Sequence, residues 1–318
     1  MLWLGLGAVL SLAAIYAIAC WLTGEALAAT WRDERRLRQL SLAELDRSCA
    51  ANPQPSGLVV SLTTIPSRID ALAPTLKSLL AQTARPAAIH LCLPEWSDRE
   101  QRAYPLPAWL TGLRSVTVVR CADEGPATKF LPTLRSVAPG QAVVVLDDDR
   151  IYHPRLLAHY ADLARRHPDE IISAAGWDAP ADRIDRPTTL WRRLRGAPHV
   201  PVRANQLRRA RSVDIVQGVH SYVVRPRFFA LAALGDFSAA PAALRFVDDV
   251  WISAHSRVPR VVHPLPLGYT DFQPRTGRAL FTGTSLGRNV NRAPRDEDRG
   301  NSVALRFFTT RWRTPASG

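Results

Sequence analysis

The sequence predicts an α/β protein built on a mainly parallel β-sheet and preceded by one transmembrane helix. Two observations support this fold class. From residue 57 onward, short apolar runs rich in β-branched residues alternate with helical patterns, which is typical of parallel strands joined by crossover helices. Before that point, residues 2–22 form an uncharged apolar run long enough for a membrane-spanning helix.

The candidate strands and helices are clearest in the first half of the chain. Strand-like runs occupy 57–65, 88–94, 115–121 and 142–149, with helical patterns at about 68–82 and 128–137. The second half is less regular, with strand-like runs at 171–177 and 213–224, an apolar helix at 227–235 and an amphipathic segment at 248–255. The sequence contains no Walker-type or GxGxxG phosphate loop.

Composition narrows the classes of partner. The 318 residues carry a net charge of +13, and Lys77 and Lys129 are the only lysines among 41 basic residues. A basic protein binds nucleic acid, an anionic membrane or a phosphate-bearing substrate, but these arginines are dispersed and are not interleaved with aromatic residues as in a stacking platform. We therefore expect no nucleic-acid partner. The four cysteines lack CxxC spacing, which argues against a zinc or disulfide framework.

The N-terminal run predicts a transmembrane anchor at 1–24. At 1.5 Å per helical residue, 21 uncharged positions are enough to cross a hydrocarbon core of about 30 Å. Trp3 and Trp21 lie near its two ends, where interfacial rings prefer to sit. A cleaved signal peptide, with small residues at 26–29, and a lipoprotein site at 17–20 are the alternatives, although both lack a basic start.

Basic residues after the run set the expected orientation. Arg32, Arg35, Arg36 and Arg38 follow it closely, and the positive-inside rule then places the bulk of the chain in the cytoplasm, anchored in the inner membrane by a single pass. Residues 25–56 are predicted to form a juxtamembrane helix and a linker, so that the folded domain begins near Gly57.

Three consecutive acids, Asp147, Asp148 and Asp149, end the fourth strand-like run. Ligands of open α/β sheets gather at the carboxyl ends of the strands, and adjacent carboxylates favour a cation such as Mg²⁺ or Mn²⁺. Along an extended strand, Asp147 and Asp149 would point to one side and Asp148 to the other. A solvated strand end or an Asp-rich turn is the alternative without function.

Four stretches together resemble the GT-A nucleotide-sugar glycosyltransferases, specifically the bacterial family-two type. They are VVSLTTIPSRI (59–69), GPATKF (125–130), VVVLDDDRIYHP (143–154) and FVDDVWIS (246–253). The resemblance spans roughly 57–272. It implies a Rossmann-like mixed sheet with flanking helices, a nucleoside-diphosphate sugar donor, and Mn²⁺ or Mg²⁺ as cofactor. It divides a catalytic domain at 57–275 into a nucleotide-binding half at 57–150 and an acceptor half at 151–275. The basic C-terminal tail at 276–318 has no counterpart in the family.

The resemblance also assigns the donor side of the site. The segment lining the nucleotide pocket matches Thr63, Thr64, Pro66 and Arg68, with Arg68 meeting the base or a phosphate. Asp147 and Asp149 match the ends of the DxD motif, in which the first acid faces the donor ribose and the last holds the metal that bridges the diphosphate. Asp148, between them, is assigned to the donor pocket. Lys129 is expected to serve the diphosphate as a point charge, with a surface lysine as the alternative.

On the acceptor side, the resemblance places an acidic pair at the start of a helix. Asp249 is the expected general base and Asp248 is expected to hold the loop or the acceptor, whereas simple helix capping is the alternative. Enzymes of this fold often recruit a late histidine as a further metal ligand, which here matches His263, or else His220. Ordinary packing is the alternative for either histidine.

The function expected from these features is a membrane-anchored, metal-dependent, inverting glycosyltransferase that acts on an envelope glycan or a lipid-linked acceptor. A haloacid-dehalogenase-like phosphohydrolase with Asp147 as nucleophile is one rival. That family needs a cation between its two acidic motifs, usually lysine, and because no lysine follows Lys129 an arginine would have to substitute here. A non-catalytic, membrane-tethered binding protein is the other, and it leaves both acidic motifs unexplained. The basic segments 192–211 and 275–299 are expected to grip a phosphate-bearing acceptor, the membrane surface or the donor, or else to form a solvated face.

Overall fold

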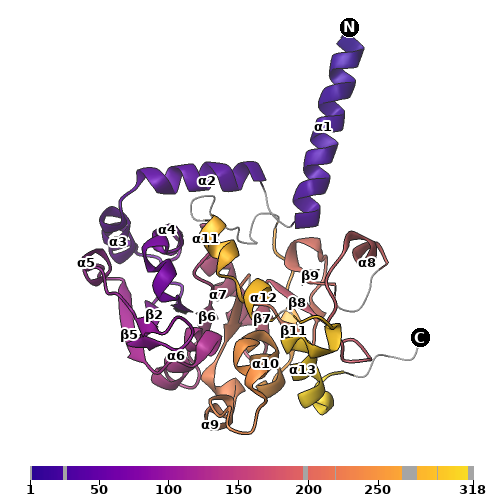
Figure 1. The fold of residues 1–318 in the computed structure, drawn as a ribbon. Helices are drawn as coiled ribbons and strands as arrows, with labels where there is room; N and C mark the ends of the chain where they lie inside the picture. The colour runs from indigo at the N-terminus through magenta and orange to yellow at the C-terminus, as the bar shows by residue number, and fades with distance from the viewer. Residues whose placement is uncertain are drawn as a thin grey trace.

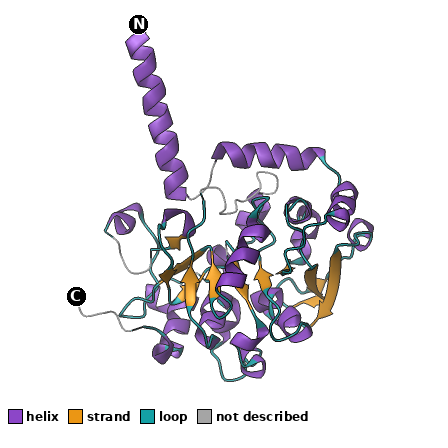
Figure 2. Cartoon of the chain, turned by 180° about the vertical axis from the view of Figure 1, so that it is seen from behind, coloured by secondary structure: helices purple, strands orange, loops and turns teal. Residues whose placement is uncertain are grey.

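The structure, a computed structural model, describes residues 2–23, 27–195, 200–218, 220–266, 278–291 and 293–313. Its centre is a large mixed β-sheet with helices packed around it, as both views of the chain show (Figure 1, Figure 2). The predicted α/β class is therefore confirmed, and the arrangement is compatible with a Rossmann-like fold.

The main sheet has eight strands in the order β10-β13-β7-β12-β6-β1-β2-β5. In chain order they are β1 (Val59–Thr63), β2 (Ala88–Pro94), β5 (Val116–Cys121), β6 (Val143–Val145), β7 (Ile171–Ser173), β10 (Arg211–Ser212), β12 (Tyr222–Val224) and β13 (Arg260–Val262). The four strands β6, β1, β2 and β5 are mutually parallel, whereas β12 is antiparallel to both its neighbours and β10 is antiparallel to β13. The sheet is thus mixed because of its second half.

The central strands are apolar because helices cover both faces of the sheet. Val60 and Leu62 of β1, Leu91 of β2 and Val144 of β6 have no exposed surface. A strand buried on both sides has no solvent-facing row to fill with polar residues, so its sequence runs continuously apolar. This is why the first-half strands could be located from the sequence.

Helices account for much of the chain outside these strands. Their bounds are α1 (Leu2–Thr23), α2 (Leu27–Gln39), α3 (Leu42–Ala51), α4 (Ala73–Leu80), α5 (Ala108–Thr111), α6 (Leu131–Ser136), α7 (Leu156–Arg166), α8 (Leu190–Leu194), α9 (Leu231–Leu234), α10 (Asp248–His255), α11 (Arg278–Gly283), α12 (Leu286–Asn289) and α13 (Gly300–Phe307). Small ribbons complete the fold: β3 (Trp96–Ser97) with β4 (Arg102–Ala103), and β8 (Ala175–Trp177) with β9 (Val202–Arg203) and β11 (Ile215–Val216).

The segment before Gly57 contributes to the folded core instead of acting only as a linker. Helix α3 begins with a capping box between Ser41 and Glu44, and its Leu45 and Cys49 are buried in the main hydrophobic cluster. The carboxylate of Asp46 accepts hydrogen bonds from the backbone N–H groups of Arg114 and Ser115, at 2.9 and 2.8 Å. The domain therefore includes residues that the composition of 25–56 assigned to a connection.

The C-terminal region also packs on the domain where the structure describes it. Phe281 of α11 and Leu305 of α13 have no exposed surface. The guanidinium of Arg313 donates to the buried carboxylate of Asp214 at 3.0 Å. This region was predicted as a basic tail, and its apolar side chains explain why the described part is folded instead.

The N-terminal helix α1 extends away from the sheet and its helices (Figure 1). Within α1, the structure describes the burial of Gly7 and of residues 9–20 only. Among these, the side chains of Leu10, Leu12 and Ile15 are more than half exposed. Over the described part of the chain, no helix has both the length and the apolar character needed to cross a membrane. The transmembrane anchor remains a prediction.

Candidate functional site

A cavity of about 630 Å³ opens at the carboxyl ends of β1 and β6. The strand order reverses between these two strands, because the chain leaves β1 toward β2 and β5 and then returns to β6 on the other side. Such a switch point is where open α/β sheets bind ligands. The sequence-predicted residues that line the cavity are Thr63, Thr64, Arg68, Lys129, Asp147, Asp148, Asp149, Asp248 and Asp249. Pro66 instead lies buried at the start of a 3₁₀ turn, Pro66–Ala71.

The three consecutive aspartates sit on a turn and not on an extended strand. Because β6 ends at Val145, the alternation of sides expected for Asp147, Asp148 and Asp149 does not apply, and all three line the cavity. Asp148 is the most enclosed: it accepts a hydrogen bond from the Thr64 hydroxyl at 2.5 Å and pairs with the Arg68 guanidinium at 2.9 Å. Asp148 therefore orients the two residues expected in a nucleotide pocket.

The surroundings of Asp149 disfavour its charged form. Burial, together with the charge of Asp148, raises the pKa of Asp149 to about 6. The Arg150 guanidinium lies 3.5 Å from this carboxylate and the Arg68 guanidinium 3.9 Å. A divalent ion at this carboxylate would favour the ionised form and reverse the shift.

Lys129 joins the two acidic motifs. It ends the 3₁₀ turn Gly125–Lys129, is only 6% exposed, and its ammonium lies 2.8 Å from Asp147 and 2.7 Å from Asp248. Burial disfavours its charge, but the two carboxylates outweigh that effect and raise the pKa of Lys129 well above the usual value. The expectation of a point charge in the site thus has a geometric basis, and the surface-lysine alternative is wrong.

Asp249 is held beside this ion pair. The acidic pair opens helix α10, and the Asp249 carboxylate accepts the backbone N–H of Gly218 at 2.8 Å. Burial and the charge of Asp248 raise the pKa of Asp249 to about 8, although Lys129 partly opposes the shift. A side chain at Gly218 would place its Cβ 2.6 Å from the Lys129 ammonium and 2.7 Å from the Asp249 carboxylate, so any other residue would have to displace these two groups.

Several residues that sequence reasoning missed complete the cavity. Arg99 and Asp123 follow the carboxyl ends of β2 and β5, so the rule that located the aspartates could have found them too. The basic segment 275–299, for which the donor was one of the expected partners, also reaches the site in its described part. The Arg68 guanidinium donates to the Thr284 hydroxyl at 2.7 Å and to the Phe281 carbonyl at 3.1 Å.

The two histidine candidates do not line this cavity. His220 is buried, and His263 pairs with Glu170 at 2.9 Å. Burial lowers the pKa of the His263 imidazole. The structure therefore does not bring His263 together with Asp147 and Asp149, because the strand that precedes it, β13, lies toward the far edge of the sheet from β6.

The fold and the cavity define an α/β protein whose acidic motifs, from two distant segments, converge on one lysine at a sheet switch point. No protein-family model matches the sequence, and no curated protein matches it significantly.

The raised pKa of Asp249 predicts a pH dependence of stability. Between about pH 4 and pH 8 the group is ionised in the unfolded chain but protonated in the folded one, so its contribution to the free energy of unfolding falls as pH rises. Asp249→Asn does not titrate. We expect the melting temperature of this variant, relative to wild type, to rise by a few degrees from pH 5 to pH 8, since 1 kcal/mol corresponds to about 2–4 °C.

Thermal unfolding followed by circular dichroism across this pH range checks the expectation. Asp70→Asn is the matched control, because Asp70 is exposed and the same chemical change there should give a constant difference. A pH-independent difference for Asp249→Asn as well would show that the carboxyl is already ionised.

Proposed function

We propose that this protein is a membrane-anchored, metal-dependent glycosyltransferase of the GT-A type, using a nucleoside-diphosphate sugar and acting on an envelope glycan or lipid-linked acceptor. The observation that carries the proposal is the convergence of two acidic motifs in one cavity, with Asp147 and Asp248 bound to the same ammonium. A transfer reaction needs one acidic group near the leaving diphosphate and another near the acceptor.

The donor half of the cavity has the charges that a nucleoside diphosphate requires. Arg68 and Arg99 line it and match the phosphates, and Asp149 is the ligand we assign to Mn²⁺ or Mg²⁺, with Asp147 beside it. Mg²⁺ is usually held by one or two carboxylates together with substrate phosphates, so a complete cage of protein ligands is not needed. When bound, the metal neutralises charge on the departing diphosphate.

Asp249 is the group we assign as general base. As the acceptor oxygen forms its bond to the anomeric carbon and the bond to the diphosphate breaks, this carboxylate takes the hydroxyl proton. With a pKa of about 8, only a minority of the protein carries Asp249 ionised at neutral pH, but that carboxylate is a stronger base than an ordinary aspartate. Activity should therefore rise as pH approaches 8. The arrangement suits inversion, because Asp249 comes from α10 and Asp149 from the turn after β6. The acceptor hydroxyl that Asp249 deprotonates can therefore attack the anomeric carbon on the face opposite the departing diphosphate.

One contact also fits the rival phosphohydrolase. The Lys129 ammonium lies 2.8 Å from Asp147, which is where a carboxylate nucleophile would have its cation. The two functions differ in what they bind: the transferase needs a nucleoside, whereas the hydrolase acts on simple phosphate esters.

The first test is nucleotide binding by the full chain in detergent. We expect calorimetric titration with UDP, GDP, ADP and CDP to show binding of at least one of them that requires Mn²⁺. Asp149→Asn should weaken it at least about tenfold, since even changes outside the first ligand shell cost about 10–100-fold in metal affinity. Asp70→Asn, the same change at an exposed site, should bind as wild type. Hydrolysis of p-nitrophenyl phosphate without nucleotide binding would support the hydrolase instead.

A second test separates chemistry from binding. Asp249→Asn should slow release of the nucleoside diphosphate from its sugar donor by about 10²–10⁴-fold, the usual contribution of a general base. The Mn²⁺-dependent affinity for the nucleoside diphosphate should stay within about twofold, because Asp249 is not a ligand in this assignment. Equal losses in both measurements would place Asp249 in the donor site and remove it as base.

We also propose that α1 is the membrane anchor. The uncharged run 2–22 extends over residues whose side chains the structure does not describe, and it is long enough to span a membrane only when these are included. Its described apolar side chains are exposed, and Arg32, Arg35 and Arg36 follow in α2. The full chain should stay in the membrane pellet after an alkaline wash, and Leu12→Arg with Ile15→Arg should release part of it, since a central arginine costs about 2.5–3.5 kcal/mol on insertion. Gln39→Arg, an added charge on exposed α2, is the control. Quantitative blotting of pellet and supernatant gives the result, and equal retention of both variants would exclude insertion of α1.

A further inference from the structure

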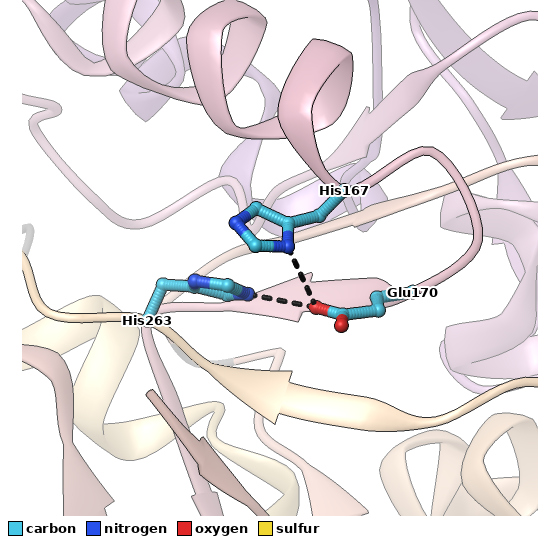
Figure 3. Close-up of side chains that lie close together, drawn as sticks. All are labelled: His167, Glu170 and His263. Carbon is cyan, nitrogen blue, oxygen red and sulfur yellow. Dashed lines mark hydrogen bonds and ion pairs between the residues drawn. The ribbon is translucent and has the colours of Figure 1, made fainter. Parts of the chain in front are cut away.

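A second group of metal-type side chains lies outside the cavity. His167 follows α7, Glu170 precedes β7 and His263 follows β13, and Figure 3 shows both imidazole rings facing the Glu170 carboxylate. Across the described residues, this is the one group of three such side chains whose ligand atoms all lie within 4.8 Å of one another. None of the three lines the aspartate cavity.

The spacing of the ligand atoms fits a small tetrahedral ion. One carboxylate oxygen of Glu170 lies 2.9 Å from Nε2 of His263 and 3.6 Å from Nδ1 of His167. Around Zn²⁺ with ligand distances of about 2.0–2.1 Å, neighbouring ligand atoms are roughly 3.3 Å apart. The two observed distances bracket that value, and the ligand atoms of His167 and His263 lie within 4.8 Å of each other.

We propose that His167, Glu170 and His263 bind a transition-metal cation, with Zn²⁺ as the best match. Two imidazoles and one carboxylate suit zinc and its neighbours in the first transition row, whereas Mg²⁺ prefers oxygen ligands throughout. A fourth position is left for water. The site is independent of the proposed transferase function and differs from the aspartate cavity in the metal that it selects.

The surroundings do not oppose a cation strongly. Arg165 and Arg166 precede His167, but both pair with Asp162, Arg165 at 2.6 Å, which offsets their charge. His263 is 4% exposed, so one ligand is fixed by packing before any ion binds. The rings of His167 and His263 are in contact, with centroids 4.4 Å apart.

The position of the group suggests what the ion does. It joins the connection between α7 and β7, where His167 and Glu170 are three residues apart, to the end of β13, where His263 lies 93 residues after Glu170. The chain then runs from His263 toward α11, whose Phe281 carbonyl contacts Arg68. An ion bound here would hold the end of β13 to the connection between α7 and β7 in the second half of the sheet.

Cobalt titration of the metal-free full chain tests the proposal. Co²⁺ takes the place of Zn²⁺ and absorbs visible light strongly when tetrahedral, so we expect one such site per chain, from which Zn²⁺ displaces it. His167→Gln and Glu170→Gln should each weaken Co²⁺ binding at least about tenfold, since even changes outside the first ligand shell cost about 10–100-fold in metal affinity. Zn²⁺ should also raise the melting temperature of wild type but not of these variants.

His159→Gln is the matched control, because His159 lies on the same helix two turns earlier and outside the group. It should bind Co²⁺ as wild type does. His167 and Glu170 are partly exposed, so their variants are expected to fold even if His263→Gln does not. Absence of tetrahedral cobalt absorption, or equal affinity in wild type and His167→Gln, would reduce the group to a Glu–His hydrogen bond and overturn the proposal.

Discussion

The rest of the site depends on the two ion pairs of the Lys129 ammonium. A buried charge is stable only with close partners, and Lys129 has two, Asp147 after β6 and Asp248 at the start of α10. Removing the lysine would leave both carboxylates facing each other and Asp249 without a counter-charge. Lys129 therefore links the two halves of the chain that form the sheet. A substitution of this lysine would affect both the fold and the site.

Backbone geometry supports that ion pair. The turn after β6 brings all three aspartates to one cavity, and the switch between β1 and β6 puts Thr64 opposite Asp148. Gly218 leaves room for Lys129 and Asp249 to approach each other. These contacts fix the positions of the carboxylates, so that like charges stay close together in the cavity.

Sequence patterns could predict the parts of this structure that are set locally. The apolar strands, the acids at the end of β6 and the acidic start of α10 follow from short stretches of sequence. The position of His263 could not be predicted, because it depends on where β13 joins the sheet. The same holds for α3, whose Leu45 reaches the core through tertiary packing. Charge-rich composition suggested a linker and a tail, yet a few well-spaced apolar residues decide whether such segments fold.

The contacts of Arg68 have a consequence for handling the protein. One guanidinium holds Asp148 inside the cavity and, at the same time, the Phe281 carbonyl and the Thr284 hydroxyl of the C-terminal region. Trimming the chain from α11 onward would thus take away part of the cavity wall and release an arginine next to the aspartates. A truncated version shortened for crystallisation would not preserve the native pocket, even though the sheet itself would remain.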